Sequence, residues 1–189
     1  MLWPVPVALV LSLAATVLVT GALHEDALAD AADGFGGGST PERVLEVMKD
    51  SRVGSYGVVA LILAILLKLA SLAALSRSDV VVALIAGHTL SRWSSVVLLN
   101  RYAYIGTKGA SFGGGVTAPR LIIATIVAFG VCALALQRRA LIPALVSVVV
   151  TMTSGAYFNR RLGGVTGDCL GAANQLVELA VYLTLAATA

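Results

Sequence analysis

Six long apolar segments restrict the fold of this chain more than any other feature of its sequence. They cover approximately residues 4–23, 57–75, 79–99, 120–136, 140–158 and 173–188. A helix needs about 20 mostly apolar residues to cross the hydrocarbon core of a bilayer. We therefore predict an all-α fold, a polytopic bundle of about six transmembrane helices that makes residues 1–189 a single integral membrane domain.

The composition excludes two other classes of protein. Apolar residues make up 58% of the chain and charged residues only 12%, whereas roughly a quarter of the residues of an ordinary soluble domain are charged. Intrinsic disorder needs low hydrophobicity together with high net charge, and this chain has neither. The net charge of +3 comes from basic residues scattered between apolar segments, so it does not indicate a nucleic-acid partner.

The Lys and Arg residues predict how the helices are oriented. With six spans, the connections 24–56, 100–119 and 159–172 fall on one side of the membrane. This side has eight basic residues, namely Arg43, Lys49, Arg52, Arg101, Lys108, Arg120, Arg160 and Arg161. The other side has three, namely Arg77, Arg138 and Arg139. By the positive-inside rule the first side is cytoplasmic, so 24–56 is a cytoplasmic acidic segment, 159–172 is a cytoplasmic glycine-rich loop, and both chain ends lie outside.

The first apolar segment has an alternative interpretation as a signal peptide. Residues 1–21 are followed by Ala27-Leu28-Ala29, which is similar to a small-residue cleavage site. However, no Lys or Arg precedes the apolar run, and the run is longer than the roughly 7–15 residues that are usual in such a peptide. We therefore interpret it as a membrane span.

Three aspartates directly after the first apolar segment form a candidate metal site. Asp26, Asp30 and Asp33 have the spacing i, i+4, i+7, so on a helix they share one face. Carboxylates at this spacing repel one another, but their oxygens would hold a divalent cation. The alternative is a charged helix face in contact with solvent. We therefore expect a divalent cation here; Mg²⁺, for example, typically takes one or two carboxylates together with waters and substrate phosphates.

A basic segment follows a predicted amphipathic helix. Ser39-Thr40-Pro41-Glu42 is a typical helix start, with Pro in the first turn. After the helix, Lys49-Asp50-Ser51-Arg52 places two cations beside an acid and a hydroxyl, and Gly54 and Gly57 follow. Arg suits phosphate recognition, and glycines let backbone N–H groups approach an anion. This segment is therefore a candidate phosphate site; the alternative is a charged loop at the membrane surface.

The connection 159–172 is a third candidate. It is rich in glycine and contains Thr166 and Asp168 at the entrance to the last apolar segment. An acid in this position is costly unless it meets a cation or a hydrogen-bond donor. The alternative is a tight turn in which the acid caps a helix. We favour a site residue, because the positive-inside rule places this loop on the same side as the acidic segment.

Some ionisable residues lie inside the apolar segments, away from their ends. Arg92 and Glu178 are candidates for a functional role, because charges inside a membrane usually face the bundle interior, where Arg92 could meet a substrate phosphate. Lys68 can instead extend its ammonium group to the membrane surface. For His88 we expect an interior position with a hydrogen-bond partner rather than a metal-binding role.

Three blocks of sequence carry a resemblance to a known family. They are residues 21–34, 48–57 and 163–172, which read GALHEDALADAADG, MKDSRVGSYG and GGVTGDCLGA. In these blocks, and in their order between apolar segments, the chain resembles the cobalamin synthase family, that is, adenosylcobinamide-GDP ribazoletransferase. The resemblance runs from about residue 18 to the end of the sequence.

The resemblance implies the last assembly step of the cobalamin nucleotide loop. Adenosylcobinamide-GDP and α-ribazole, or its 5′-phosphate, would give adenosylcobalamin, or its 5′-phosphate, and GMP in a Mg²⁺-dependent reaction. It also implies a multi-pass protein of the bacterial inner membrane with its active site on the cytoplasmic side. The expected partners are these substrates and membrane lipid, without nucleic acid, and a homo-oligomer is left open.

This reaction suggests a role for each candidate residue. Mg²⁺ is expected on the acidic residues Asp26, Asp30, Asp33 and Asp168. The catalytic set is His24, Glu25, Asp26 and Asp30, in which His24 or Glu25 is the candidate base for the incoming hydroxyl. The substrate-binding set is Lys49, Asp50, Ser51, Arg52, Thr166 and Asp168, in which Arg52 and Lys49 neutralise phosphate oxygens.

The chain departs from the family pattern in two places, and two other functions stay open. Ala27 stands where the family usually has glycine, and family members usually begin with a further N-terminal segment. A CDP-alcohol phosphotransferase also uses an Asp-rich membrane helix with Mg²⁺, but its pattern places Gly and Arg between the aspartates, and residues 27–32 contain neither. A cation-coupled transporter would need acids near the middle of the bilayer, whereas these acids are expected mostly at its cytoplasmic edge.

Overall fold

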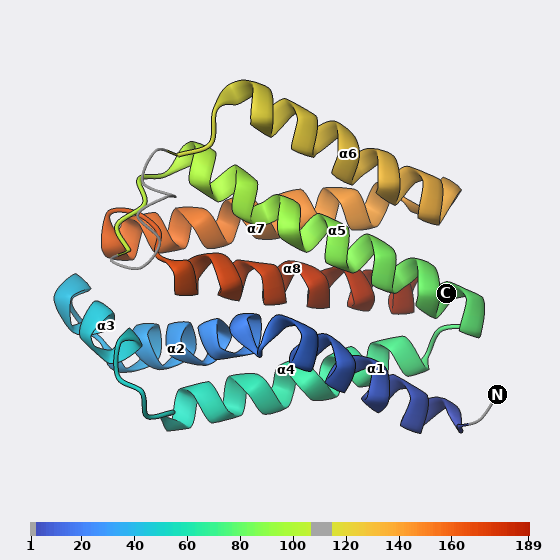
Figure 1. The fold of residues 1–189 in the computed structure, drawn as a ribbon, viewed down its shortest axis with the longest axis horizontal. Helices are drawn as coiled ribbons and strands as arrows, with labels where there is room; N and C mark the ends of the chain where they lie inside the picture. The colour runs from blue at the N-terminus through green and yellow to red at the C-terminus, as the bar shows by residue number, and fades with distance from the viewer. Residues whose placement is uncertain (1–2, 107–114) are drawn as a thin grey trace.

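The apolar segments fold into long helices that lie side by side in one bundle (Figure 1). The computed structural model describes residues 3–106 and 115–189, and most of these are helical. In chain order the elements are α1 (Val5–Thr20), α2 (Leu23–Gly37), α3 (Pro41–Met48), α4 (Ser55–Ala73), α5 (Arg77–Arg101), α6 (Ala118–Leu136), the 3₁₀ helix η2 (Gln137–Arg139), α7 (Leu141–Leu162) and α8 (Gly167–Ala187). The predicted all-α fold is confirmed.

The membrane spans agree with the prediction except at the first one. Among the described residues, five helices, α4 to α8, are long and apolar enough to cross a membrane. The first predicted span is broken, because α1 ends after 16 residues and meets α2 at an angle of 86°. At the break, Gly21 and Ala22 have φ angles of 63° and 58°, a left-handed conformation that interrupts a right-handed helix. Six spans result if the bent pair is counted as one.

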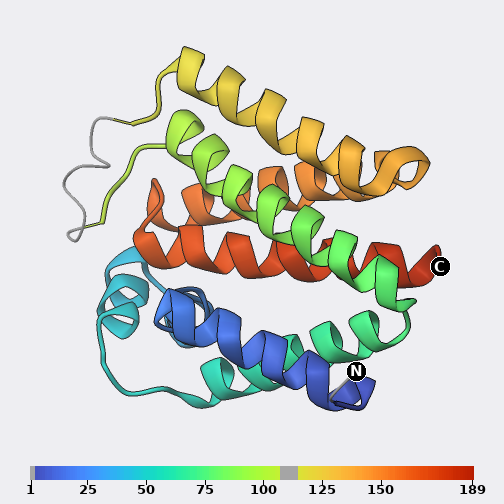
Figure 2. The ribbon, with the colours of Figure 1, turned by 45° about the vertical axis from the view of Figure 1, so that its right-hand side comes forward.

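α8 is the central helix of the bundle. It packs against α2, α4, α5 and α7, and most of its residues are buried. Small residues at its start, Gly171, Ala172 and Ala173, allow this close packing. Figure 2 shows α5 and α7 on one side of α8, with α2 and α4 on the other. Side chains of α8 can therefore reach four neighbouring helices.

The two ends of the bundle carry different connections (Figure 1). One end carries α3 and the connections α3–α4, α5–α6 and α7–α8, and we call it the α3 end. Two of these connections are joined by backbone hydrogen bonds of 2.9 Å, which Val165 donates to Ala103 and Ile105 donates to Val165. The start of α1 and the end of α8 lie at the opposite end. The basic residues predicted to share one side lie at or next to the α3 end, apart from Lys108, which is outside the described residues.

The acidic segment is packed into the bundle rather than projecting from it. α2 lies against α4 and α8, and its alanines Ala27, Ala29 and Ala31 are buried. α3 lies at the end of the bundle, where Thr40 caps it by accepting a hydrogen bond from the Arg43 N–H group. The predicted connection 24–56 therefore needs a correction: its first part is a helix of the bundle, because the chain bends by 86° at the α1–α2 break and α2 then lies along α8.

Candidate active site

α2 and α8 run antiparallel in close contact, and two contacts fix their register. Nε2 of Gln175 donates a hydrogen bond of 2.9 Å to Oε1 of Glu25. Closer to the α3 end, Gly171 lies directly against Ala27, without room for a side chain on the glycine. The absence of a Cβ at position 171 thus lets the two helices approach each other at the level of the predicted catalytic residues.

All four predicted metal ligands, Asp26, Asp30, Asp33 and Asp168, lie on this helix pair. Asp168 on α8 and Asp30 on α2 each lie three residues from the contact of Gly171 with Ala27, on the side of the α3 end. Because an α-helix rises about 1.5 Å per residue, these two acids reach the same level of the pair. Both are half-buried, whereas Asp26 is exposed near the start of α2. The register therefore places acids that are far apart in the sequence at the same level of two packed helices.

The geometry limits how a metal ion could be held here. In the part of the chain that the structure describes, no three His, Cys, Asp or Glu side chains are placed to hold a metal ion together. Mg²⁺ does not need such a cluster, because it is usually bound by one or two carboxylates together with waters and substrate phosphates. A cation at this site would therefore depend on the substrate for part of its coordination.

Asp33 has a different role from the other aspartates. Its Oδ2 accepts a hydrogen bond of 2.7 Å from the Gly54 N–H group, and its Oδ1 accepts one of 2.9 Å from Gly57. Only 7% of the residue is exposed. The two glycines let backbone N–H groups approach an anion, as the sequence suggested, but the anion is this carboxylate. Asp33 attaches the start of α4 to α2, so it does not fit the expected metal-binding set.

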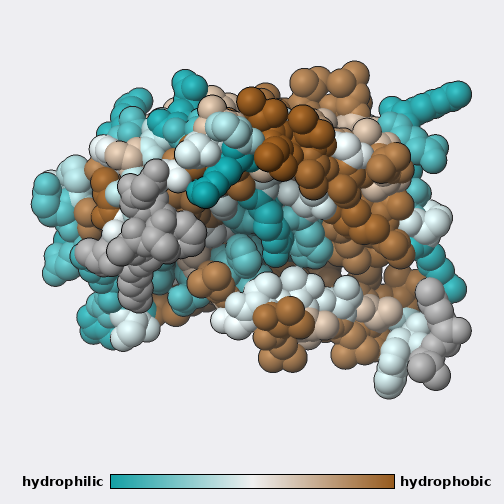
Figure 3. Space-filling view, turned by 45° about the horizontal axis from the view of Figure 1, so that its top comes forward, coloured by the Kyte–Doolittle hydropathy of each residue, from teal (hydrophilic) through white to brown (hydrophobic). Residues whose placement is uncertain are grey.

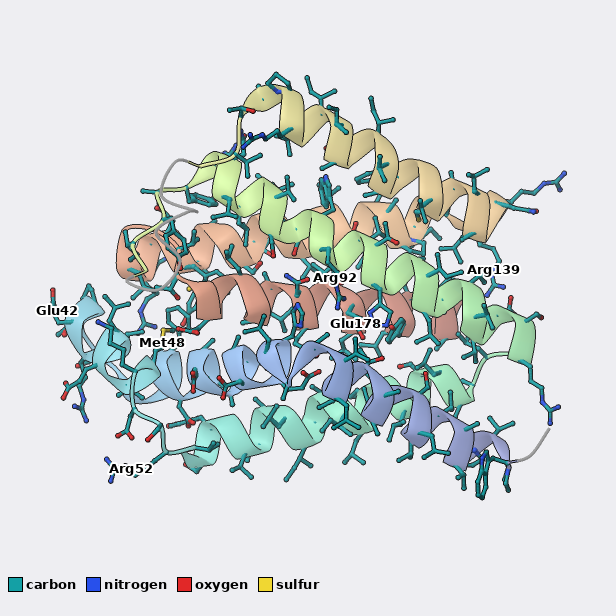
Figure 4. All side chains as sticks on the ribbon, viewed as in Figure 1. Glu42, Met48, Arg52, Arg92, Arg139 and Glu178 are labelled. Atoms are coloured by element: carbon teal, nitrogen blue, oxygen red, sulfur yellow. The ribbon has the colours of Figure 1, made fainter. Side chains whose placement is uncertain are left out.

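The predicted phosphate-binding segment faces solvent at the α3 end. Arg52 donates hydrogen bonds from Nε to Oδ1 of Asp50 (3.0 Å) and from Nη2 to Oδ2 (2.6 Å). These bonds hold the pKa of Asp50 at about 2, well below its usual range. Arg52 points away from the bundle in Figure 4, and Lys49 and Ser51 are also exposed. This segment therefore lies at the entrance to the bundle and not in the contact between α2 and α8.

Thr166 and Asp168 begin α8 and have different environments. Thr166 is buried, and its Oγ1 caps the helix by accepting a hydrogen bond of 3.3 Å from the Cys169 N–H group. Asp168 lies in the first turn of α8, where the helix dipole stabilises a carboxylate. Burial and the charge of Asp168 raise the pKa of the nearby Tyr104 hydroxyl. Of the two predicted residues, Asp168 is the better candidate for a metal ligand, because the Thr166 hydroxyl already caps the helix.

His24 and Glu25 lie in the first turn of α2, next to the break. Gln175 binds Oε1 of Glu25, but Oε2 is buried and has no hydrogen-bond partner among the described residues. The same holds for Oδ1 of Asn174, the neighbour of Gln175. Buried polar atoms of folded proteins nearly always have partners. These two oxygens therefore indicate that water or a ligand completes this part of the site.

A buried polar network that the sequence did not predict lies deeper in the bundle. Nζ of Lys68, on α4, is 2.6 Å from Oε1 of Gln175 and 2.9 Å from Oε1 of Glu178. The Tyr182 hydroxyl donates a bond of 3.1 Å to the same oxygen of Glu178. The expectation that Lys68 extends to the membrane surface is wrong, because the residue is only 3% exposed. Its charge is instead balanced by an acid inside the bundle.

The second oxygen of Glu178 faces α5. Oε2 lies 3.4 Å from Nδ1 of His88 and 3.6 Å from Nη1 of Arg92. The same Nη1 is 3.0 Å from Nδ1 of His88. Glu178 thus faces the bundle interior, as predicted, whereas Arg92 and His88 reach it from partly exposed positions on α5.

The sequence did contain a signal for this network. Gln175, Glu178 and Tyr182 follow one another at intervals of three and four residues, so they share one face of a helix. Lys68 and Arg92 are cations within other apolar segments. A polar face on one span and cations on two others together predict a buried network. Any one of these residues alone does not.

Polar groups also reach the surface between the two ends of the bundle. In Figure 3 hydrophilic side chains cover the α3 end and continue into the middle of the face shown, while hydrophobic side chains cover much of the remainder. The side chain of Arg92 is 41% exposed although it lies well inside α5. Figure 4 shows Arg92 and Glu178 near the middle of the bundle. The acids of α2 and α8 and the buried network therefore form one polar region, which extends from the α3 end into the bundle.

Known proteins align with nearly the whole chain. Residues 1–186 match the sequence profile of the family described as cobalamin-5-phosphate synthase. An adenosylcobinamide-GDP ribazoletransferase of Shewanella amazonensis is 43% identical over 192 residues, which cover 97% of this chain and 74% of the relative. Proteins of the same name from a Polaromonas species and from Shewanella halifaxensis are 44% and 45% identical, over 95% and 97% of this chain and 72% and 74% of theirs. No solved structure matches the chain.

Proposed function

Since the chain belongs to the cobalamin-5-phosphate synthase family, we propose that it joins adenosylcobinamide-GDP to α-ribazole, or to α-ribazole 5′-phosphate, and releases GMP. The observation that carries the proposal is the register of α2 and α8, which brings Asp30 and Asp168 to one level of the helix pair. The unpaired oxygen of Glu25 lies on the same pair. This arrangement supports a site for a cation and a charged phosphate ester.

The proposed reaction is a phosphoryl transfer. The α-ribazole hydroxyl attacks the phosphorus atom that carries cobinamide, the bond from this phosphorus to the oxygen of GMP breaks, and the hydroxyl proton passes to a base. Such reactions depend on charge neutralisation and in-line positioning more than on covalent catalysis. The polar region offers carboxylates for a cation, an unpaired carboxylate oxygen and cationic side chains, which are the groups that the reaction needs.

Mg²⁺ is the cation that suits the available donors. Asp26, Asp30 and Asp168 offer only oxygen atoms, which Mg²⁺ prefers, and they come from two helices. When bound there, Mg²⁺ would neutralise charge on the diphosphate of the substrate. We leave Asp33 out of this set, because both of its oxygens already hold the start of α4.

The remaining predicted residues would bind the substrates and take up the proton. Glu25 is our first candidate for the base, since Gln175 holds one oxygen and leaves the other without a partner among the described residues. His24, in the same helical turn, is the second candidate. Lys49 and Arg52, exposed at the α3 end, would attract anionic substrates toward the acids.

We also propose that the α3 end faces the cytoplasm and that the bundle lies in the inner membrane of a bacterium. Basic residues are concentrated at this end, which the positive-inside rule assigns to the cytoplasm. An acidic region that is continuous with this end would be accessible to charged, water-soluble substrates.

The test is to incubate membranes that contain the protein with adenosylcobinamide-GDP, α-ribazole and Mg²⁺, and to measure GMP. We expect GMP to form, and Asp30→Asn to lower the rate by ~10²-fold or more without changing membrane insertion. Glu42→Gln is the matched control, because this acid is exposed on α3 (Figure 4), and it should keep the wild-type rate. Folded wild-type protein that forms no GMP, or a fully active Asp30→Asn variant, would contradict the proposal. Release of CMP from a CDP-alcohol would indicate the other phosphotransferase family instead.

A further inference from the structure

Arg92 lies inside a long membrane helix and uses only part of its guanidinium group. Its Nη1 donates a hydrogen bond of 2.9 Å to Oγ of Ser91, and the same nitrogen faces His88 and Glu178. Within residues 3–106 and 115–189, Nε and Nη2 of Arg92 donate no hydrogen bond. The side chain is 41% exposed. The remaining N–H groups of this permanent cation are therefore available to a ligand.

The charges around Arg92 favour an anionic ligand. Glu178 is shared by two cations, with Lys68 at 2.9 Å from Oε1 and Arg92 at 3.6 Å from Oε2. Glu178 contacts both cations, so neither has a carboxylate of its own, and Glu25, the other acid nearby, is hydrogen-bonded to Gln175 and forms no ion pair with Arg92 within the described residues. A guanidinium group inside a membrane span is costly unless it meets a polar partner or a water-filled space. An anion would accept hydrogen bonds from the available N–H groups and give the guanidinium group a charged partner of its own.

Glu178 holds Arg92 in a defined position. Lys68 and Tyr182 both bind Oε1 of Glu178, which turns Oε2 toward α5. Oε2 in turn faces the Nη1 side of the guanidinium group, so the planar group can present Nε and Nη2 together. Two parallel N–H groups of this kind suit two oxygens of one phosphate.

Arg92 occupies the inner end of the polar region. Glu178, which faces it, is ten residues from Asp168 along α8, or about 15 Å at the usual helical rise. Between these two levels, Gln175 connects α8 to Glu25. An extended phosphorylated substrate could therefore reach the acids near the α3 end with one part and Arg92 with another.

We propose that Arg92 is a substrate-binding residue that holds a phosphate group, and that Glu178 is its positioning residue. The inference rests on the function proposed above and names the group that this part of the site recognises. Two phosphates would offer the same chemistry: the diphosphate of adenosylcobinamide-GDP and the 5′-phosphate of α-ribazole 5′-phosphate.

The experiment measures kcat and KM of Arg92→Gln for three substrates: adenosylcobinamide-GDP, α-ribazole and α-ribazole 5′-phosphate. If Arg92 holds the diphosphate, KM for adenosylcobinamide-GDP should rise roughly 10- to 100-fold, as expected for a lost charged hydrogen bond, with the ratio of the two ribazole KM values unchanged. If Arg92 holds the 5′-phosphate, only KM for the phosphorylated ribazole should rise. Glu178→Gln should raise the same KM by a smaller factor. A purely structural role would lower the yield of folded enzyme without changing one KM selectively.

Arg101→Gln is the matched control, because it removes an exposed arginine from the same helix, and its three KM values should stay at wild-type levels. If Arg92→Gln does not fold, Arg92→Lys keeps the charge but loses the paired N–H groups, and it should show the same selective change. The inference is overturned if wild-type enzyme forms GMP while a folded Arg92 variant keeps all three KM values. Failure of the wild-type enzyme to form GMP from any of these substrates would instead overturn the proposed function.

Discussion

Gly171 of α8 lies so close to Ala27 of α2 that a Cβ carbon at position 171 would overlap the methyl group of the alanine. The next nearest atoms, in His24 and Leu23, are 3.7 Å from the same point, which is ordinary van der Waals contact. The contact therefore accommodates one methyl group between the two helices but not two. Because this contact sets the register that places Asp168 and Asp30 at the same level of the helix pair, it connects packing to the candidate active site.

The contact predicts that a substitution at position 27 restores the activity that a substitution at position 171 removes. Gly171→Ala should push α8 away from α2 and reduce transfer activity by at least tenfold, since misplacement of reacting groups by about 1 Å can cost ~10²-fold. The double variant Ala27→Gly with Gly171→Ala moves the methyl group to the other helix and should recover most of the activity. Rates of GMP formation by the two variants decide the matter, with Ala27→Gly alone as the control. A double variant as inactive as Gly171→Ala would refute the register argument.

A second prediction separates Asp33 from the other aspartates. Asp33→Ala removes the acceptor of two backbone N–H groups and should lower the free energy of unfolding by about 1–3 kcal/mol per buried group left unpaired. Asp30→Asn, which keeps the size of the side chain, should cost less stability than Asp33→Ala while lowering the transfer rate ~10²-fold or more. Thermal unfolding in detergent, measured beside the transfer assay, compares the two. If Asp33→Ala keeps wild-type stability but needs a much higher Mg²⁺ concentration for transfer, Asp33 is a metal ligand after all.

The break between α1 and α2 predicts opposite effects at neighbouring positions. Ala22 has φ 58°, and a residue with a Cβ pays roughly 1–2 kcal/mol in this left-handed conformation. Ala22→Gly should therefore be neutral or stabilise the protein by up to about 1 kcal/mol, after the extra backbone entropy of glycine is subtracted. Gly21→Ala should destabilise it by about 1 kcal/mol through the backbone alone, because no atom lies within 4 Å of the added Cβ.

Denaturant titration of both variants tests this prediction. The two changes alter the same turn by one methyl group each, so each serves as the control for the other. Loss of stability in Ala22→Gly would mean that this turn is not left-handed in the folded protein.

The pair formed by Asp50 and Arg52 predicts how the segment before α4 responds to pH. Arg52 lowers the pKa of Asp50 from 3.8 to about 2, so the pair stabilises this segment fully above pH 3.8 and loses its effect as the pH falls through about 2. Pepsin, which is active in acid, should cleave residues 49–54 slowly at pH 4 and faster near pH 1.5. Arg52→Gln should be cleaved rapidly already at pH 4. Equal cleavage of the two proteins at pH 4 would show that the pair does not order this segment.

The helices could be predicted from the sequence more reliably than the turn between the first two. Long apolar segments can be counted from composition alone, and five of them are single helices. The break at Gly21 and Ala22 was not predicted, because it lies inside an apolar segment and alanine normally favours a helix. This turn places α2 among the other helices of the bundle. Because the turn was not predicted, the acidic segment was expected outside the bundle.

The candidate site was predictable as far as local patterns and membrane sidedness allow. Placing the acidic segment and the loop 159–172 on one side of the membrane suggested that Asp30 and Asp168 meet. The local pattern could not identify the anion that the N–H groups of Gly54 and Gly57 approach. In the structure this anion is the carboxylate of Asp33. Nor could it place Lys68, whose partner Glu178 is 110 residues away. Partners at such separations depend on how the helices pack, and that information is not contained in any single segment.

The convergence of Lys68, His88, Arg92 and Tyr182 on one carboxylate has a consequence for how this protein can change. Each of these groups contacts Glu178, so removal of any one alters the hydration and orientation of the acceptor that the others use. Energetic effects of neighbouring substitutions are generally not additive. Double-mutant cycles among the four positions should therefore give coupling energies that differ from zero. In evolution, these residues should be replaced together rather than one position at a time.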